Sequence, residues 1–385
     1  MEEANVVEDG VVDLDQFTEL PLLTKTELRE QNARLRSTEP GSNVRENTSG
    51  GTTGEPVEFL QDDEYLFWNN ANKIYYQRLA GRELGEPMVK LWGDESAVTG
   101  ESKDLKFRLS NFILNRHFLN SYRMNAETMT EHVKRINEIK PRSMEVYVES
   151  MNELAKHIEQ NDLAVHSPNG ILSTAGTLHE PVRERIERVF NAPVLNKYGS
   201  REVGDVACES PHEEGMHVFD HTHYVEVVDD NGDPLPPGKE GELAITVLTN
   251  YTMPLIRYRI GDMGIMKENQ NGGELPFSKL ETVTGRVTDH FRTPDGELVY
   301  PGYLRKVLYH RDWIKKFQIR QTAVDHVVYR IVLTNGSEPA RSELDEIEQQ
   351  AKKLLGDEIE IEFTFPDEIT ASDSGKYRYT VSEIV

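Results

Sequence analysis

Apolar positions along the chain recur with two different spacings, and the change between them predicts the fold class. From residue 163 onward, an apolar run at GILSTAG, a segment of helical spacing at EPVRERIERVF and a second apolar run at PVLNKYG follow one another. This strand–helix–strand order is typical of an α/β architecture. Residues 216–262 instead alternate apolar and polar positions between turn signals such as DNGDP, which predicts a β-rich subdomain.

Other segments carry the spacing of amphipathic helices, and local signals mark some of their ends. Thr24 can cap a helix, because Glu27 lies at the third position after it, as in a capping box. Lys140-Pro141 breaks a later helical stretch, and the short apolar run MEVYV follows the break. A strand-like VEFL precedes the first long helix. The helices expected lie at about 62–79, 126–138, 149–160 and the SELDEIEQQAKKLL stretch.

The length of the chain and a restart of the pattern predict two domains. With 385 residues, the chain is too long for one simple core. The pattern restarts near Gly285, after the polar stretch KENQNGGE, and residues 304–365 show the order strand, strand, helix, strand. We therefore expect an α/β fold with a large domain over 1–284, containing parallel sheets and the β-rich subdomain. A small mobile α+β domain is expected over 285–385.

Composition and charge exclude several classes of protein. The apolar content of 37% supports a packed core, but no apolar run is long enough to cross a bilayer, so no membrane partner is expected. The acidic start MEEANVVEDG differs from a signal peptide, which predicts a cytoplasmic protein. A net charge of −24 argues against nucleic acid as a partner. Cys208 is the only cysteine, so no intrachain disulfide can form.

The chemically most informative segment is the loop NTSGGTTGEP at residues 47–56. Glycines let a backbone approach an anion closely, and amide and hydroxyl hydrogens can then bind phosphate oxygens. The loop is not a Walker loop, because its spacing differs and no lysine follows. A flexible linker is the alternative interpretation. The candidate phosphate-binding residues are Thr48, Ser49, Gly50, Gly51, Thr52, Thr53 and Gly54.

Further short motifs follow this loop in a fixed order. They are YGSRE at 198–202, GEL at 241–243, YRIGD at 258–262, GRVTD at 285–289 and SGKYR at 374–378. Together with the loop, this order resembles the adenylate-forming superfamily of acyl- and aryl-CoA ligases, luciferases and peptide-synthetase adenylation domains. The segments LPLLTKTELRE, KPRSMEVYVESMNELA and GTLHEPVRERIERVFNAPVLNKYGSREVG resemble its phenylacetate-CoA ligase and CapK-like branch. The resemblance covers nearly the whole chain.

This resemblance implies how the chain would hold ATP. The loop would bind the phosphates, and Glu202 would bind Mg²⁺, a hard ion that needs an oxygen ligand. The ring of Tyr198 would stack on the adenine, with Gly199 and Ser200 beside it in the same motif. Arg201 stands where the family usually has threonine, and its role stays open.

The remaining motif residues would contact the ribose and the reacting groups. Asp262 would accept hydrogen bonds from both ribose hydroxyls, and Arg286 would also bind the ribose. Ala175 and Gly176 would lie against the adenine and the acid. Lys376 would bridge the acid carboxylate and the α-phosphate, where it neutralises the charge that builds up as one anion attacks another. The expected catalytic residues are Thr53, Glu202 and Lys376.

Two features depart from the pattern of the family. The hinge position two residues after Arg286 is Thr288, where relatives usually have an acidic residue or lysine. Many relatives bind zinc through a Cys/His set that includes cysteines before the hinge, and the stretch NQNGGELPFSK has none. A metal site is the alternative interpretation of Cys208 and the nearby histidines. The alternation through His217, Phe219, His221 and His223 instead predicts one face of a strand.

The resemblance implies an enzyme that uses ATP and Mg²⁺ to activate a small-molecule carboxylic acid as an acyl-adenylate. It implies coenzyme A as the acyl acceptor; transfer to an amine or to a carrier-protein thiol is the alternative. A non-catalytic nucleotide-binding relative and a phosphotransferase are further alternatives. The oligomeric state is not readable, and a homodimer stays an option. Candidate side chains for the acid pocket are Trp92, Phe112, His117, Phe118 and Tyr122.

Overall fold

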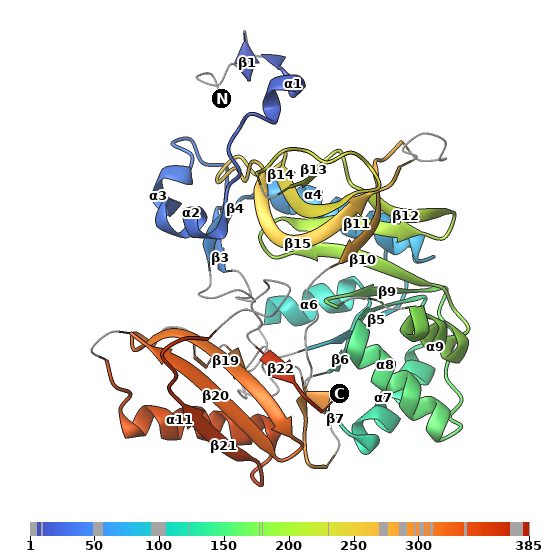
Figure 1. The fold of residues 1–385 in the computed structure, drawn as a ribbon. Helices are drawn as coiled ribbons and strands as arrows, with labels where there is room; N and C mark the ends of the chain where they lie inside the picture. Colours follow the sequence, from blue (N-terminus) through green and yellow to red (C-terminus); the bar gives the residue numbers. More distant parts are fainter. Residues whose placement is uncertain are drawn as a thin grey trace. The chain divides into compact units, whose positions relative to one another are not determined.

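A computed structural model gives the fold of the chain (Figure 1). The residues that it describes are 6–8, 11–48, 57–93, 105–121, 123–176, 178, 180–229, 231–268, 276–284, 291–295, 298–299, 304–305, 307–308, 311–334, 337–369 and 380–384. The chain divides into two compact units, which we call the first and the second unit. The first comprises Met1–Ser49, Val57–Glu83 and Leu195–Arg286, and the second comprises Gly50–Pro56, Leu84–Val194 and Val287–Val385. The domain boundary expected near residue 285 stays a prediction.

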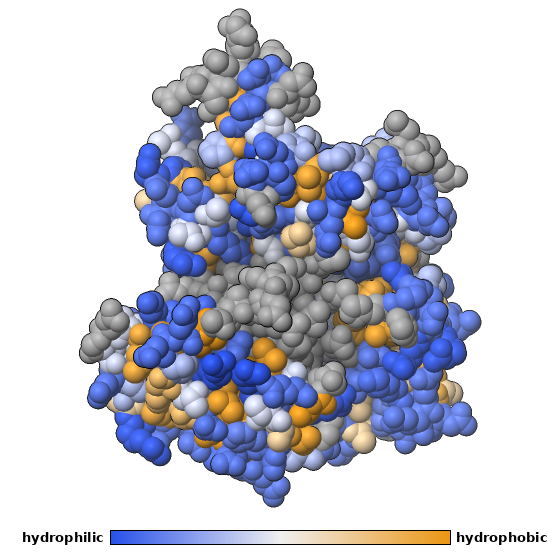
Figure 2. Space-filling view, viewed as in Figure 1, coloured by the Kyte–Doolittle hydropathy of each residue, from blue (hydrophilic) through white to orange (hydrophobic). Residues whose placement is uncertain are grey.

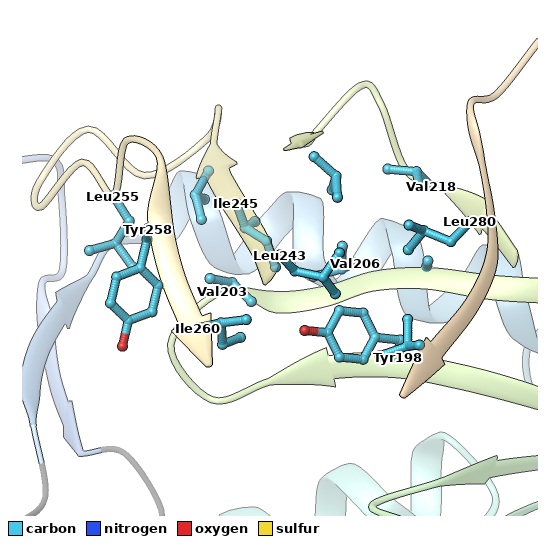
Figure 3. Close-up of a cluster of buried hydrophobic side chains, with 14 of the residues drawn as sticks. Tyr198, Val203, Val206, Val218, Leu243, Ile245, Leu255, Tyr258, Ile260 and Leu280 are labelled. Atoms are coloured by element: carbon cyan, nitrogen blue, oxygen red, sulfur yellow. The ribbon is translucent and has the colours of Figure 1, made fainter. Parts of the chain in front are cut away.

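The first unit contains an antiparallel sheet with the strand order β13-β14-β15-β16-β12-β11-β10. The strands are β10 (Val194–Ser200), β11 (Gly204–Ser210), β12 (Glu213–Val218), β13 (His223–Val228), β14 (Glu240–Val247), β15 (Tyr258–Met266) and β16 (Lys279–Thr284). Alternate apolar side chains from these strands form one buried cluster, part of which is drawn in Figure 3. The β-rich subdomain expected over 216–262 is therefore confirmed.

The described part of the first unit also contains the long helix α4 and several shorter elements. Helix α4 (Asp63–Leu79) packs on β11, and Asp62 caps it by accepting a hydrogen bond from the Tyr65 amide. The capping box predicted at Thr24 is present and begins helix α2 (Lys25–Glu30). The other elements are β1 (Val7–Glu8), β2 (Val11–Val12), α1 (Leu14–Phe17), α3 (Asn32–Leu35), β3 (Arg45–Thr48) and β4 (Glu58–Gln61).

The second unit contains parallel strands in the order β9-β8-β5-β6. Parallel pairing requires crossover connections, which the helices between these strands provide. The strands are β5 (Met88–Trp92), β6 (Arg116–Asn120), β8 (Ser143–Tyr147) and β9 (Gly170–Thr174). The helices are α6 (Leu105–Ile113), α7 (Ala126–Ile139), α8 (Val148–Gln160) and α9 (Glu180–Phe190). Helix α7 ends before Lys140-Pro141, as the predicted break requires, and Lys140 caps it in a left-handed conformation.

The C-terminal part of the second unit has the predicted order strand, strand, helix, strand. The elements are β19 (Ile314–Ala323), β20 (His326–Leu333), α11 (Arg341–Leu355) and β21 (Glu360–Thr364). A further strand, β22 (Thr380–Ser382), follows them and completes a sheet of order β21-β20-β19-β22. Apolar side chains of α11 pack on this sheet around Tyr329. A separate small sheet joins β17 (Phe291–Arg292), β18 (Leu298–Val299) and β7 (Arg123–Met124).

The predicted α/β fold class is confirmed, with parallel strands, a β-rich subdomain and a small C-terminal α+β region. The histidine alternation was interpreted wrongly as one face of a single strand. β12 ends at Val218 and β13 begins at His223, so a turn separates His217 from His223. In the view of Figure 2, hydrophilic side chains cover most of the described surface, as a charged content of 29% predicts. Among the described residues, no helix has the length and apolar content needed to cross a bilayer.

Candidate functional site

Several of the predicted site residues lie outside the described residues. These are Ser49, Gly50, Gly51, Thr52, Thr53, Gly54, Arg286 and Lys376. Of the phosphate-binding loop, the structure describes Thr48, which is exposed and ends β3. The Thr48 amide donates a hydrogen bond to Asn47 Oδ1 at 2.9 Å. The other predicted residues, which belong to the YGSRE, YRIGD and GILSTAG segments, can be placed.

The structure brings together two residues that were predicted to contact the nucleoside. Tyr198 lies on β10 and Asp262 on β15, and the Tyr198 hydroxyl donates a hydrogen bond to Asp262 Oδ2 at 3.1 Å. The Tyr198 side chain is 9% exposed and belongs to the buried cluster of Figure 3. Asp262 is half-buried. A phenol that donates to one carboxylate oxygen orients the carboxylate, so its second oxygen keeps a defined direction.

A bulge directly after Tyr198 explains why glycine follows it. The register between β10 and β11 shifts between Tyr198 and Gly199. A Cβ atom on Gly199 would lie 2.3 Å from the carbonyl oxygen of Gly204 and 3.0 Å from the Cα atom of Asp205. No side chain fits there without moving backbone. Bulges of this kind redirect side chains and occur often beside functional sites.

Ser200 fixes the turn that carries the predicted magnesium ligand. Its Oγ accepts hydrogen bonds from the amides of Glu202 at 3.2 Å and Val203 at 3.4 Å. From the other side, the Gln61 side chain donates to the carbonyl oxygen of Arg201 at 3.0 Å. The glycine and the serine of YGSRE thus have separate structural roles. The glycine permits the bulge, and the serine caps the turn on which Glu202 lies.

Glu202 is buried, with 5% of its surface exposed, and its carboxylate faces a positive group. Lys25 Nζ lies 3.5 Å from Glu202 Oε1. Burial raises the pKa of the nearby Tyr65 hydroxyl, and the carboxylates of Asp205 and Glu202 raise it further. A single carboxylate ligand is compatible with Mg²⁺, which takes most of its other ligands from phosphates and water, and Glu202 would be that ligand. Among the described residues, no group of three or more Cys, His, Asp or Glu side chains could hold a metal ion by itself.

In the second unit, the predicted Ala175 and Gly176 directly follow β9. Ala175 has a φ of +63°, a left-handed conformation that is costly for a residue with a side chain. A Cβ atom on Gly176 would lie 3.4 Å from Val148 Cβ, at ordinary contact distance. Strained backbone at the carboxyl end of a parallel strand marks a common place for ligand binding.

The carboxyl ends of two neighbouring parallel strands carry an aromatic pair. Trp92 ends β5 and Tyr147 ends β8, and their ring centroids lie 4.3 Å apart. Lys90 Nζ lies 4.5 Å from the Trp92 ring and 2.9 Å from Glu145 Oε2. Sequence reasoning named Trp92 but missed Tyr147, although Tyr147 lies in the apolar run MEVYV that was predicted after the break at Pro141. Of the other pocket candidates, the Phe112 side chain is 84% exposed, and Tyr122 lies outside the described residues.

The histidines near Cys208 have separate partners. His217 Nε2 lies 3.3 Å from Glu213 Oε2, and Lys279 also forms an ion pair with Glu213. His221 Nε2 lies 2.9 Å from Asn72 Oδ1. His223 Nε2 donates to the carbonyl oxygen of Val203 at 2.7 Å, so His223 supports the turn that carries Glu202. Burial lowers the pKa of His223 to about 4, which keeps this ring neutral near pH 7.

Comparison with known proteins shows which families this chain resembles. Residues 291–383 match the family described as the CapK C-terminal domain. Protein CapK of Staphylococcus aureus is 23% identical over 376 residues, which cover 96% of this chain and 80% of CapK. Phenylacetate-coenzyme A ligase of Pseudomonas putida is 26% identical over 292 residues, which cover 73% of this chain and 63% of that enzyme.

Solved structures show the same fold. The crystal structure of 2-hydroxyisobutyryl-CoA ligase in the thioesterification state matches with a TM-score of 0.62 and 19% identity. The match covers 99% of this chain and 84% of that structure. These similarities support the resemblance to the adenylate-forming superfamily, in the branch that contains CapK and the phenylacetate-CoA ligases.

Proposed function

We propose that this chain activates a carboxylic acid with ATP as an acyl-adenylate and transfers the acyl group to the thiol of coenzyme A. The hydrogen bond from Tyr198 to Asp262 carries this proposal, because it joins two residues from separate motifs that are both expected at the nucleoside. The buried Glu202 on its Ser200-capped turn supports it further. The relative from Pseudomonas putida, named a phenylacetate-coenzyme A ligase, supports coenzyme A as the acceptor.

In the first step, a carboxylate oxygen of the acid attacks the α-phosphorus of ATP. An O–P bond forms, the bond from this phosphorus to the bridging oxygen of the β-phosphate breaks, and pyrophosphate leaves with that electron pair. Acid and triphosphate are both anions, and the chain itself has a net charge of −24, so the site needs local cations. Mg²⁺ bound at Glu202 would supply positive charge beside the phosphates. Lys376 would neutralise the charge between the carboxylate and the α-phosphate.

The nucleoside residues position ATP for this attack. Asp262 would accept hydrogen bonds from the ribose hydroxyls, and Tyr198 would keep the Asp262 carboxylate in the required orientation. Correct placement of two reactants lowers a barrier strongly, because it removes the entropy cost of bringing them together. Tyr198 is thus proposed as a positioning residue and as the residue whose ring meets the adenine.

In the second step, the thiolate of coenzyme A attacks the carbonyl carbon of the acyl-adenylate. A C–S bond forms, the C–O bond to the phosphate breaks, and AMP leaves with the electron pair, so that a thioester results. An amine in place of the thiol would give an amide by the same displacement. We propose the thiol.

The aromatic pair Trp92–Tyr147 is proposed as a contact surface for the acid. It lies at the carboxyl ends of two parallel strands of the second unit. Neither residue belongs to one of the proposed nucleotide-binding motifs. Aromatic rings favour flat apolar groups, which makes an aryl acid the expected substrate. Trp92→Ala should then weaken the use of aryl acids more than the use of small aliphatic acids.

Pyrophosphate exchange into ATP, measured with a panel of aryl and aliphatic acids, tests the first step. We expect acid-dependent exchange with at least one aryl acid. Tyr198→Phe should raise the KM for ATP about fivefold, because one hydrogen bond contributes about 1 kcal/mol. Tyr251→Phe is the matched control, because Tyr251 is exposed in the same unit and should leave this KM unchanged. ATP binding without exchange for any acid would instead indicate a non-catalytic nucleotide-binding protein.

Product analysis tests the acceptor. Release of AMP together with an acyl thioester when coenzyme A is added would support the second step. Amide formation with amines, and no thioester with coenzyme A, would overturn the proposed acceptor while leaving acid activation in place.

A further inference from the structure

The buried Glu202 carboxylate has a cationic partner from a distant part of the chain. Lys25 begins helix α2 in the N-terminal segment, and its Nζ lies 3.5 Å from Glu202 Oε1. Both side chains are largely withdrawn from water, with 18% of the Lys25 side chain and 6% of the Glu202 side chain exposed. Water screens such a pair only weakly, so the charge of one group strongly affects the binding of other ions to its partner.

Local structure holds the backbone of Lys25 firmly. Thr24 Oγ accepts a hydrogen bond from the Glu27 amide at 3.2 Å, and Glu27 Oε2 accepts one from the Thr24 amide at 2.8 Å. This capping box fixes the first turn of α2, on which Lys25 lies. Leu28, on the next turn, is fully buried and packs into the main apolar cluster of the first unit.

The residues before Lys25 are fixed to strand β15, which also carries Asp262. The Leu23 amide donates to the carbonyl oxygen of Arg257 at 3.1 Å, and the Arg259 amide donates to the carbonyl oxygen of Leu23 at 2.9 Å. These two hydrogen bonds form a parallel bridge between Leu23 and Tyr258. Lys25 therefore follows two residues after a direct attachment to a strand of the proposed nucleotide site.

A buried arginine strengthens this attachment. Arg257 is 1% exposed, and its guanidinium donates to the carbonyl oxygens of Thr18, Leu20 and Gly232. It also donates to Glu226 Oε2 at 3.1 Å, which compensates its charge. A buried arginine with these partners holds the segment before Lys25 in one position. The fold of the first unit thus holds Lys25 next to Glu202, which distinguishes this ion pair from a pair of exposed surface charges.

We propose that Lys25 is the resident counterion of Glu202, which a divalent cation must displace in order to bind this carboxylate. Both cations are attracted to the same carboxylate, and a Lys25 ammonium 3.5 Å from Glu202 Oε1 repels a second cation beside it. Metal binding at Glu202 is then an exchange of one cation for another. The N-terminal segment thereby sets how tightly the site binds a divalent ion. This inference rests on the proposed function, because it assigns Glu202 as the ligand of the metal.

Binding of Mn²⁺, a paramagnetic substitute for Mg²⁺, tests the proposal without any measurement of activity. Free and bound Mn²⁺ are measured by electron paramagnetic resonance, with and without ATP. Lys25→Met should bind Mn²⁺ at least about tenfold more tightly than the wild type, because it lacks the competing charge. Lys25→Arg should stay within about threefold of the wild type. Arg29→Met is the matched control, since it removes a charge from an exposed position of the same helix.

The outcomes separate this inference from the proposed function. Equal or weaker Mn²⁺ binding by a folded Lys25→Met variant, with binding still lost in Glu202→Gln, would overturn the counterion role and leave the metal site in place. Unchanged Mn²⁺ binding in Glu202→Gln would overturn the metal site itself. Thermal unfolding without metal gives a second readout. Lys25→Met and Glu202→Gln should each lower the Tm, and the double variant should lower it by less than the sum.

Discussion

His223 makes the stability of the first unit sensitive to acid, and the size of the effect can be worked out. Its ring is 3% exposed, and Nε2 donates to the carbonyl oxygen of Val203. Burial lowers the pKa of His223 from 6.5 to about 4 in the folded protein. Between these two pH values, the unfolded chain binds a proton that the folded chain does not. The stabilisation is therefore fully present above pH 6.5 and is lost as the pH falls toward 4.

The expected loss follows from the difference between the two pKa values. They differ by about 2.5, and each pH unit corresponds to about 1.4 kcal/mol, so the full contribution of His223 is about 3 kcal/mol. At pH 4.5 most of this, about 2–3 kcal/mol, should already be lost. His223→Gln keeps a donor for the Val203 carbonyl but cannot titrate. Between pH 7 and pH 4.5, the free energy of unfolding of His223→Gln should therefore fall by about 2–3 kcal/mol less than that of the wild type.

Urea unfolding at pH 7 and pH 4.5 measures this difference for both proteins. Carboxylates that titrate in the same pH range affect wild type and His223→Gln equally. Their contribution cancels when the loss of stability of one protein is subtracted from that of the other. Equal m-values at pH 7 would show that the variant unfolds from a similarly compact state. The same loss of stability in wild type and His223→Gln would refute the argument, because it would mean that His223 does not stay neutral inside the folded unit.

Two further predictions concern the predicted motif residues. Gly199→Ala should destabilise the protein by about 1–3 kcal/mol in urea unfolding, because its Cβ would lie 2.3 Å from the Gly204 carbonyl oxygen. Gly176→Ala, whose Cβ meets Val148 at an ordinary contact distance, is the control, and equal effects of the two substitutions would contradict the steric argument. Lys376→Ala should slow pyrophosphate exchange by about 10²–10³-fold, as expected for loss of a preorganised charge. Normal exchange in this variant would remove Lys376 from the proposed mechanism.

Local signals in the sequence were sufficient for several helices and for the succession of strands and helices along the chain. Thr24 and Glu27 lie three residues apart, so their capping box forms within a single turn and depends on little else. Helix α9 spans the whole stretch EPVRERIERVF, because its apolar positions repeat with the helical period. The order of the short motifs indicated the superfamily for the same reason, since each motif is a short continuous stretch of residues.

Strand boundaries and cross-strand partners were harder to predict. The sequence alternates from His217 to His223, but the chain turns after Val218, and the two histidines face different neighbours. Alternation shows which residues share a face only while a strand continues. It does not show where the hydrogen bonds of the ladder stop, because those depend on the partner strands β11, β14 and β16.

The sequence alone predicted the fold class, the helix cap at Thr24 and the candidate nucleotide-binding residues, because each of these depends on a short continuous stretch of residues. Only the tertiary structure decided which of these residues meet. The bond from Tyr198 to Asp262 and the ion pair of Lys25 with Glu202 join residues far apart in the chain. Their pairing depends on strand register and on the anchoring of the N-terminal segment by Arg257. Neither is encoded by any single stretch, since both result from the packing of the whole unit.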